Sequence, residues 1–165
     1  MSLSAAALEK IDREVAKYPR GHAQSAVMAA LAIAQDEHGW LSTATMDAVA
    51  KHLGMPPVAV YEVATFYSMY DLAPAGRFKL SICTNLPCAL SGANEAAAHL
   101  QATLGVGFGE TTADGVFTLR EYECMGACGD APVLTVNNKR MCSRMQAAAI
   151  DALVAELRAA AGKTG

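Results

Sequence analysis

Charged residues are scarce in this 165-residue sequence, and no long apolar run is present. They make up 18% of the chain, with 13 Lys and Arg against 16 Asp and Glu, which gives a formal net charge of −3. Without a run of about 18 apolar residues, no direct membrane insertion is expected. Without a Lys/Arg cluster to neutralise phosphates, no nucleic-acid partner is expected. The first residues lack the basic-then-apolar order of a signal peptide, so the sequence predicts a cytoplasmic protein.

Disulfide frameworks, fibrous repeats and disorder are excluded as well. Apolar residues make up 53% of the chain, which is enough for a domain of this size to bury a core. The five cysteines are expected to be reduced in the cytoplasm, where disulfides are rare. The C-x-x-C pair typical of thioredoxin chemistry is missing. These absences favour metal binding or redox chemistry for the thiols.

Residues 1 to about 70 are predicted to form helices only, because four apolar stripes recur at helical spacing between Pro, Gly, Ser and Thr boundaries. No helix is basic enough to enter a DNA groove, which favours a small helical bundle over a helix-turn-helix domain. The aromatic end at 66–70 is expected either in the bundle core or as an anchor for a partner. The stripes are Leu8, Ile11 and Val15; Val27, Ala30, Leu31 and Ala34; Met46, Val49, Ala50 and Leu53; and Val60, Val63, Ala64 and Tyr67.

A Pro/Gly connector at 71–76 is followed by alternating strands and helices. Strands are predicted at 77–82 and 116–122, and a single helix between them ends at Gly105. The apolar stripe of that helix consists of Leu90, Ala97, Leu100 and Leu104.

The last part of the chain is expected to form a hairpin and a closing helix. Asn137-Asn138 is typical of a two-residue turn, here between strands at 133–136 and 139–142. Ser143 and Gln146 have the spacing of a capping box, which predicts that the last helix starts there. The order β-α-β, hairpin, helix predicts a thioredoxin-like fold. The fold class is thus α+β or α/β, with a helical bundle for partner docking at 1–72 and a thioredoxin-like domain at 73–165.

Four cysteines form two pairs, each after a predicted strand. Cys83 and Cys88 give C-x4-C, and Cys124 and Cys128 give C-x3-C. We expect both pairs in βα-type loops at one edge of the sheet, where two loops can converge on one centre. A two-iron cluster needs four thiolates, and each short loop suits one iron. Structural zinc also takes four thiolates but usually in tighter C-x2-C knuckles, so the spacing favours iron–sulfur over zinc and places a reactive dithiol third.

Such a cluster is anionic, and nearby positive charge would ease its reduction. The helix expected to start near Cys88 is one such source of charge, through its N-terminal dipole. The other candidates are Arg120, Lys139, Arg140 and Arg144.

The segments CTNLPCALSG (83–92) and ECMGACGDAP (123–132) closely resemble the cluster motifs of the thioredoxin-like 2Fe-2S subunit of respiratory complex I, the NuoE family. EHGWLS (37–42) and EVATFYSMY (62–70) resemble the helical N-terminal segment of that family, so the resemblance spans essentially the whole chain. It implies a thioredoxin-like 2Fe-2S ferredoxin domain. It also implies that Cys83, Cys88, Cys124 and Cys128 ligate one 2Fe-2S cluster, one pair per iron.

The resemblance further implies an electron-transfer subunit of NADH:quinone oxidoreductase, peripheral to the bacterial inner membrane and not catalytic alone. The resemblance also implies a partner flavoprotein subunit that binds FMN and NADH, and the glycines at 105–109, which lack the dinucleotide-binding pattern, agree with this. Electron buffering near the flavin is the expected role. The alternative is the homologous subunit of an NAD-dependent formate dehydrogenase or bidirectional hydrogenase diaphorase. An alternative of another class is a zinc-stabilised interaction module.

Other residues invite interpretation but are expected to be structural. Cys142 is predicted in the core, with a spare ligand or redox-sensing thiol as the alternative. The Ala131–Pro132 peptide is predicted to be cis, as is common before this strand in thioredoxin-like folds. The histidines lie in predicted helices away from the cysteine loops, which disfavours a Rieske-type centre; they are His22, His38, His52 and His99.

Overall fold

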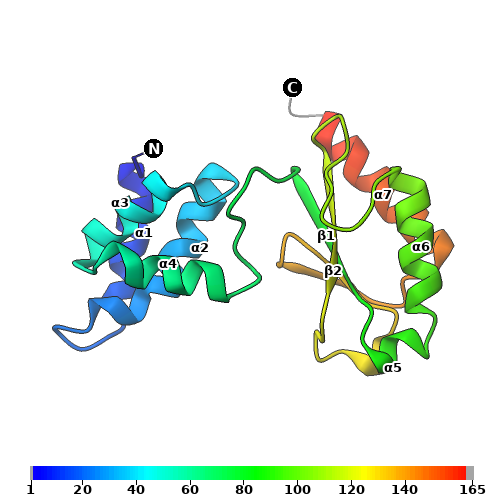
Figure 1. Cartoon of the computed structure of the whole chain (residues 1–165), viewed down its shortest axis with the longest axis horizontal. Helices are drawn as coiled ribbons and strands as arrows, with labels where there is room; N and C mark the ends of the chain where they lie inside the picture. The colour runs from blue at the N-terminus through cyan, green and yellow to red at the C-terminus, as the bar shows by residue number, and fades with distance from the viewer. Residues whose placement is uncertain (1, 163–165) are drawn as a thin grey trace. The chain divides into compact units, whose positions relative to one another are not determined.

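The computed structural model of the chain describes residues 2–162 (Figure 1). These residues cluster into two compact units that divide between Pro74 and Ala75. Helices alone build the described part of the first unit, whereas the second combines helices with a four-stranded sheet. Each unit contains its own hydrophobic core.

The first unit consists of α1 (Ala5–Val15), the 3-10 helix η1 (Ala23–Ala26), α2 (Val27–His38), α3 (Thr43–Leu53) and α4 (Pro57–Phe66). The hydroxyls of Ser4 and Ser42 cap α1 and α3, each accepting a backbone N–H of the first turn at 3.1 Å. Gly39 and Gly54 end α2 and α3 at φ 79° and 65°, which glycine adopts without strain. The four helices predicted from the sequence are confirmed.

The inward side of each helix forms the core of this unit. Ile11, Leu31, Val49 and Val60 come from the four predicted stripes, and all are fully buried. Burying one such side chain contributes about 1.5–3 kcal/mol. Tyr67 was predicted on the fourth stripe, but α4 ends one residue earlier and the Tyr67 side chain is 39% exposed.

Hydrogen bonds from α2 explain why the helix does not continue. The side-chain amide of Gln35 donates to the carbonyl of Met69 at 3.0 Å and accepts the N–H of Asp71 at 2.6 Å. The Tyr70 hydroxyl donates to the carbonyl of Met28 at 2.8 Å. These bonds hold the segment after α4 against α2, and a helical path would break them.

The second unit contains β1 (Phe78–Cys83), α5 (Leu86–Ala89), α6 (Ala93–Leu104), β2 (Phe117–Tyr122), the 3-10 helix η2 (Cys128–Asp130), β3 (Leu134–Val136), β4 (Arg140–Cys142) and α7 (Ala147–Gly162). The strand order is β2-β1-β3-β4, with β1 parallel to β2 and antiparallel to β3. α6 and α7 lie side by side against the sheet (Figure 1). This is the thioredoxin-like arrangement predicted from the sequence.

The single helix predicted after β1 is in fact two helices. Gly92 adopts φ 92° between α5 and α6, and Leu90 lies between the two helices with 81% of its surface exposed. Ala97, Leu100 and Leu104 are buried, as expected. Leu90 precedes Ala97 by seven residues, the same interval that separates Ala97 from Leu104, so apolar spacing alone could not reveal the break.

The capping box predicted at 143–146 is wrong, because α7 begins only at Ala147. Arg144 adopts φ 53°, and its N–H donates to the carbonyl of Asp130 at 2.8 Å. The Met145 N–H donates to the carbonyl of Pro132 at 2.9 Å. Residues 143–146 are therefore bonded to the loop of the second cysteine pair and do not form the first turn of α7.

The predicted hairpin and the predicted cis proline are both confirmed. Asn137 and Asn138 adopt φ 54° and 56°, but Val136 pairs in register with Arg140, so three residues (137–139) rather than the predicted two connect β3 to β4. The Ala131–Pro132 peptide bond is cis. Among residues 2–162, no helix combines the length and apolarity needed to cross a membrane.

Candidate functional site

Both cysteine pairs lie at one edge of the sheet. Cys83 is the last residue of β1 and pairs in register with Tyr122, the last residue of β2. Because the two strands are parallel, the loops that follow them leave at the same edge. We call Cys83 and Cys88 the first pair, and Cys124 and Cys128 the second pair. The second loop leads through η2 to β3 rather than to a helix, so it is not the βα-type loop expected from the sequence.

The first pair is buried. Cys83 and Cys88 are each 1% exposed, and they pack with Ala93 and Val133. Regular elements hold both residues, since one ends β1 and the other lies in α5. The Cys83 N–H donates to the carbonyl of Val133 at 3.1 Å. These contacts fix the positions of two thiols before any ligand binds.

The second pair lies on an exposed loop. Cys124 follows β2, and Cys128 begins η2; both are exposed. Gly126 has φ 71°, and its N–H donates to the sulfur of Cys124 at 3.3 Å. Glycine permits this backbone conformation, which directs an amide dipole at the sulfur.

The pKa of the Cys88 thiol depends on burial and on the other three thiols. Burial raises the pKa of Cys88 to about 11, helped by a hydrogen bond with Cys83 and by the charges of Cys83, Cys128 and Cys124. Within residues 2–162, no three His, Cys, Asp or Glu side chains are grouped to hold a single metal ion.

The charged groups expected around the site have different roles in the structure. The guanidinium of Arg140 pairs with Glu156 on α7. That of Arg144 lies 3.8 Å from the carboxylate of Asp130, two residues beyond Cys128. The helix that carries Cys88 begins at Leu86 and has only four residues, so the helix dipole expected at its N-terminus is small.

Two hydrogen bonds that were not predicted join the loop of the first pair to the end of β2 and to the loop of the second pair. The hydroxyl of Thr84 donates to the carboxylate of Glu121 at 2.7 Å. The side-chain amide of Asn85 donates to the carboxylate of Glu123 at 3.0 Å. The sequence contains one sign of these bonds: polar residues directly follow the first strand and also stand at the end of the next strand, and the loops after these strands were expected to lie close together.

The residues expected to be structural have partners or packing of their own, each within its own unit. Cys142 is 9% exposed and belongs to the sheet–helix core. His52 lies 2.7 Å from Asp12, and His99 lies 2.7 Å from Asp151. The prediction of packing or surface roles is confirmed for these three residues.

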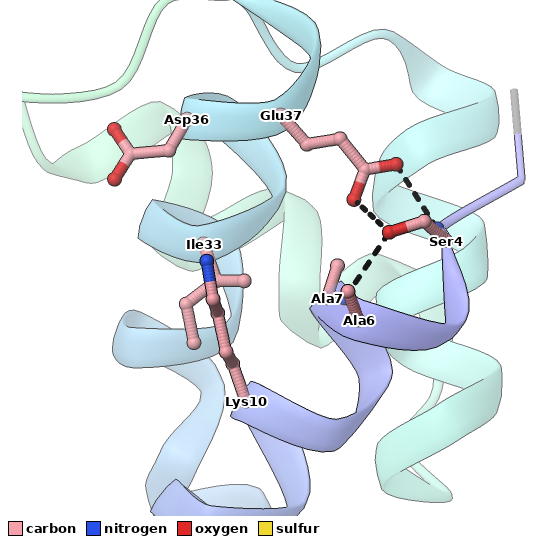
Figure 2. Close-up of a pocket in the computed structure, with 7 residues that line it drawn as sticks. All are labelled: Ser4, Ala6, Ala7, Lys10, Ile33, Asp36 and Glu37. Carbon is pink, nitrogen blue, oxygen red and sulfur yellow. Dashed lines mark hydrogen bonds between the residues drawn. The ribbon is translucent and has the colours of Figure 1, made fainter.

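A pocket of about 290 Å³ lies between α1 and α2 in the first unit (Figure 2). Glu37 lines this pocket, and its carboxylate accepts the Ser4 N–H at 3.0 Å and the Ser4 hydroxyl at 2.9 Å. These bonds lower the pKa of Glu37, the backbone bond contributing most. The pocket contains none of the predicted site residues, and its polar contacts join α1 to α2.

A family-wide sequence model of thioredoxin-like [2Fe-2S] ferredoxins matches residues 11–158. The chain belongs to this family. The resemblance seen in the two cysteine motifs is thereby confirmed, and the cofactor is one 2Fe-2S cluster, which needs four thiolates. The donor set fits this cofactor, because both thiol pairs lie at one sheet edge and one backbone N–H donates to a thiol sulfur.

Two similar proteins match most of the chain, and both are named as subunits of NADH-quinone oxidoreductase. The one from Rhizobium meliloti is 46% identical over 152 residues, covering 92% of this chain and 89% of that protein. The one from Thermus thermophilus is 39% identical over 149 residues, covering 90% of this chain and 82% of that protein.

A similar solved structure comes from a much longer chain. It is a chain of the NAD+-reducing [NiFe]-hydrogenase in the air-oxidized state, with a TM-score of 0.67 and 25% identity. The match covers 78% of this chain and 22% of the hydrogenase chain.

Proposed function

We propose that the chain is the iron–sulfur electron-transfer subunit of an NADH:quinone oxidoreductase and works as part of that enzyme. The two NADH-quinone oxidoreductase subunits described above match it over nine-tenths of its length. The observation that carries the proposal is the convergence of two cysteine pairs at one sheet edge in a chain of this family. When bound, the cluster supplies one-electron storage.

In this proposal, Cys83 and Cys88 ligate one iron, and Cys124 and Cys128 ligate the other. The buried first pair excludes water from its side, while the exposed second pair faces outward. The Gly126 N–H supports the negative charge on the Cys124 sulfur. The protein therefore positions the thiolates and sets the charge around them, and hydride chemistry belongs elsewhere.

The partner is a flavoprotein subunit that binds FMN and NADH and passes electrons to this chain. The first unit is the proposed docking region for subunits of the complex. Its exposed apolar side chains support this role, because Val58 and Phe66 are 60% and 79% exposed. Such side chains are typical of interfaces. The proposed location is the cytoplasmic face of the bacterial inner membrane, reached through the complex.

The proposal is tested by reconstituting the purified chain with iron and sulfide under reducing conditions. We expect reducible visible absorbance with two irons and two sulfides per chain. Changing any one of the four cysteines to serine should lower the cluster content, whereas Cys142→Ser serves as the matched control. A colourless chain that takes up only zinc would refute the proposal and support the zinc module.

The hydrogenase match favours a second candidate, the homologous subunit of an NAD+-reducing hydrogenase. Affinity purification of the chain from its own cells separates the two candidates. Co-purification with quinone-module subunits supports the first, and co-purification with a nickel-containing subunit supports the second.

A further inference from the structure

The loop of the first cysteine pair and the loop of the second pair are joined by side chains that lie next to the cysteines. Thr84 and Asn85 directly follow Cys83, and Glu123 directly precedes Cys124. The Asn85–Glu123 bond therefore spans from one loop to the other, and the Thr84–Glu121 bond joins the first loop to the end of β2. A backbone bond from the Thr84 N–H to the Tyr122 carbonyl, at 3.3 Å, adds to them.

Asn85 links this contact to a cysteine through both ends of its side-chain amide. Its nitrogen donates to Glu123, while its oxygen accepts the Leu86 N–H at 3.0 Å and caps α5. α5 carries Cys88, so the position of Glu123 is coupled to that of a thiol on the other loop. One side chain thus contacts both the exposed loop and the helix that carries Cys88.

We propose that Asn85 and Glu123 are positioning residues, which hold the two cysteine loops at the spacing that the cluster needs and set a negative charge beside it. Thr84 and Glu121 form the second bond of the same contact. The proposal rests on the proposed function. It assigns two separate effects to this contact. The hydrogen bond governs how well the chain retains the cluster, and the carboxylate governs how readily the cluster accepts an electron.

Asn and Asp have the same shape, as do Gln and Glu, so the two effects can be varied independently. Glu123→Gln keeps an acceptor for Asn85 and removes one negative charge. Asn85→Asp keeps the cap of α5 but turns the donor into a carboxylate that faces another carboxylate. The double variant Asn85→Asp/Glu123→Gln restores a hydrogen bond with reversed polarity and keeps the wild-type charge.

The test uses the reconstituted full chain and two measurements: the rate at which an iron chelator bleaches the cluster, and the equilibrium constant for its one-electron reduction. We expect Asn85→Asp to bleach at least about tenfold faster, because a charge-assisted bond is replaced by repulsion. Glu123→Gln and the double variant should bleach like wild type. Glu123→Gln should raise the reduction constant about threefold or more, and the double variant should leave it unchanged.

Two further variants keep these outcomes interpretable. Asp114→Asn removes a charge in the turn that precedes β2, at the opposite end of this strand from the cysteines, and should change neither measurement. Thr84→Val removes only the hydroxyl donor to Glu121 and should speed bleaching, which covers the case that Asn85→Asp does not fold. Wild-type bleaching in Asn85→Asp, or no rescue in the double variant, overturns the proposal. If wild type itself forms no cluster, the proposed function fails instead.

Discussion

Tyr70 lies near the end of the helical unit. Ionisation of its hydroxyl should make the free energy of unfolding of that unit change with pH in the alkaline range. The side chain is 6% exposed and donates to the carbonyl of Met28 at 2.8 Å. Burial, with a smaller contribution from Tyr67, raises its pKa from 10.0 to about 12. Because the neutral form is favoured in the folded chain, its stabilisation is complete below pH 10.0 and is lost as the pH rises toward about 12.

The change Tyr70→Phe removes both the hydrogen bond and the titration. At neutral pH the variant should be less stable by about 1 kcal/mol, the usual net value of such a bond. Above the ordinary tyrosine pKa, ionisation stabilises only the unfolded wild type, by up to about 2.7 kcal/mol over the shifted range. The two stability curves should therefore cross at about pH 10.6, and the variant should be more stable above it.

Urea unfolding followed by tryptophan fluorescence measures this effect in the correct unit, because Trp40 is the one tryptophan in the sequence and lies between α2 and α3. Other groups that titrate in this range, such as Cys88 and Tyr61, are common to both chains and cancel in the difference. Parallel stability curves from pH 8 to 11 would refute the argument, since they would show that Tyr70 has no raised pKa.

Three further predictions follow from burial. Brief alkylation of the cluster-free folded chain should label the exposed second cysteine pair well before the buried first pair and Cys142. Mass spectrometry of the peptides measures the labelling of each cysteine, and the unfolded chain serves as the reference. Gly76→Ala should lower the free energy of unfolding of the second unit by about 1–3 kcal/mol in urea, because a Cβ there would lie 2.7 Å from the Phe117 carbonyl carbon. Gly162→Ala is the control and should be neutral, because a Cβ there meets open space. Cys142→Ser should retain the visible spectrum of the reconstituted chain, and bleaching would assign it a role at the cluster.

Helices and strands with a buried stripe were predictable because burial and spacing agree in them. The four helices of the first unit follow from such stripes. The Asn-Asn turn follows from the backbone conformation that asparagine tolerates, and the shared sheet edge follows from the position of each cysteine pair after a strand. The break at Gly92 and the end of α4 were not predictable. The first leaves the apolar interval intact, and the second depends on bonds from Gln35, which lies more than thirty residues earlier in the sequence.

The false capping box shows why local signals fail near the site. Ser143 and Gln146 have the right spacing, but Arg144 and Met145 instead donate to carbonyls of the loop that carries the second cysteine pair. That loop contains a cis peptide bond and a 3-10 turn but no long regular element, so it needs donors from another segment to satisfy its carbonyls. A delay in the start of α7 supplies them. The exposed pair is therefore held by tertiary bonds from two sides, residues 143–146 and the Asn85–Glu123 contact, whereas β1 and α5 hold the buried pair directly. Under the proposed ligation, changes in either tertiary contact should affect the second pair before the first.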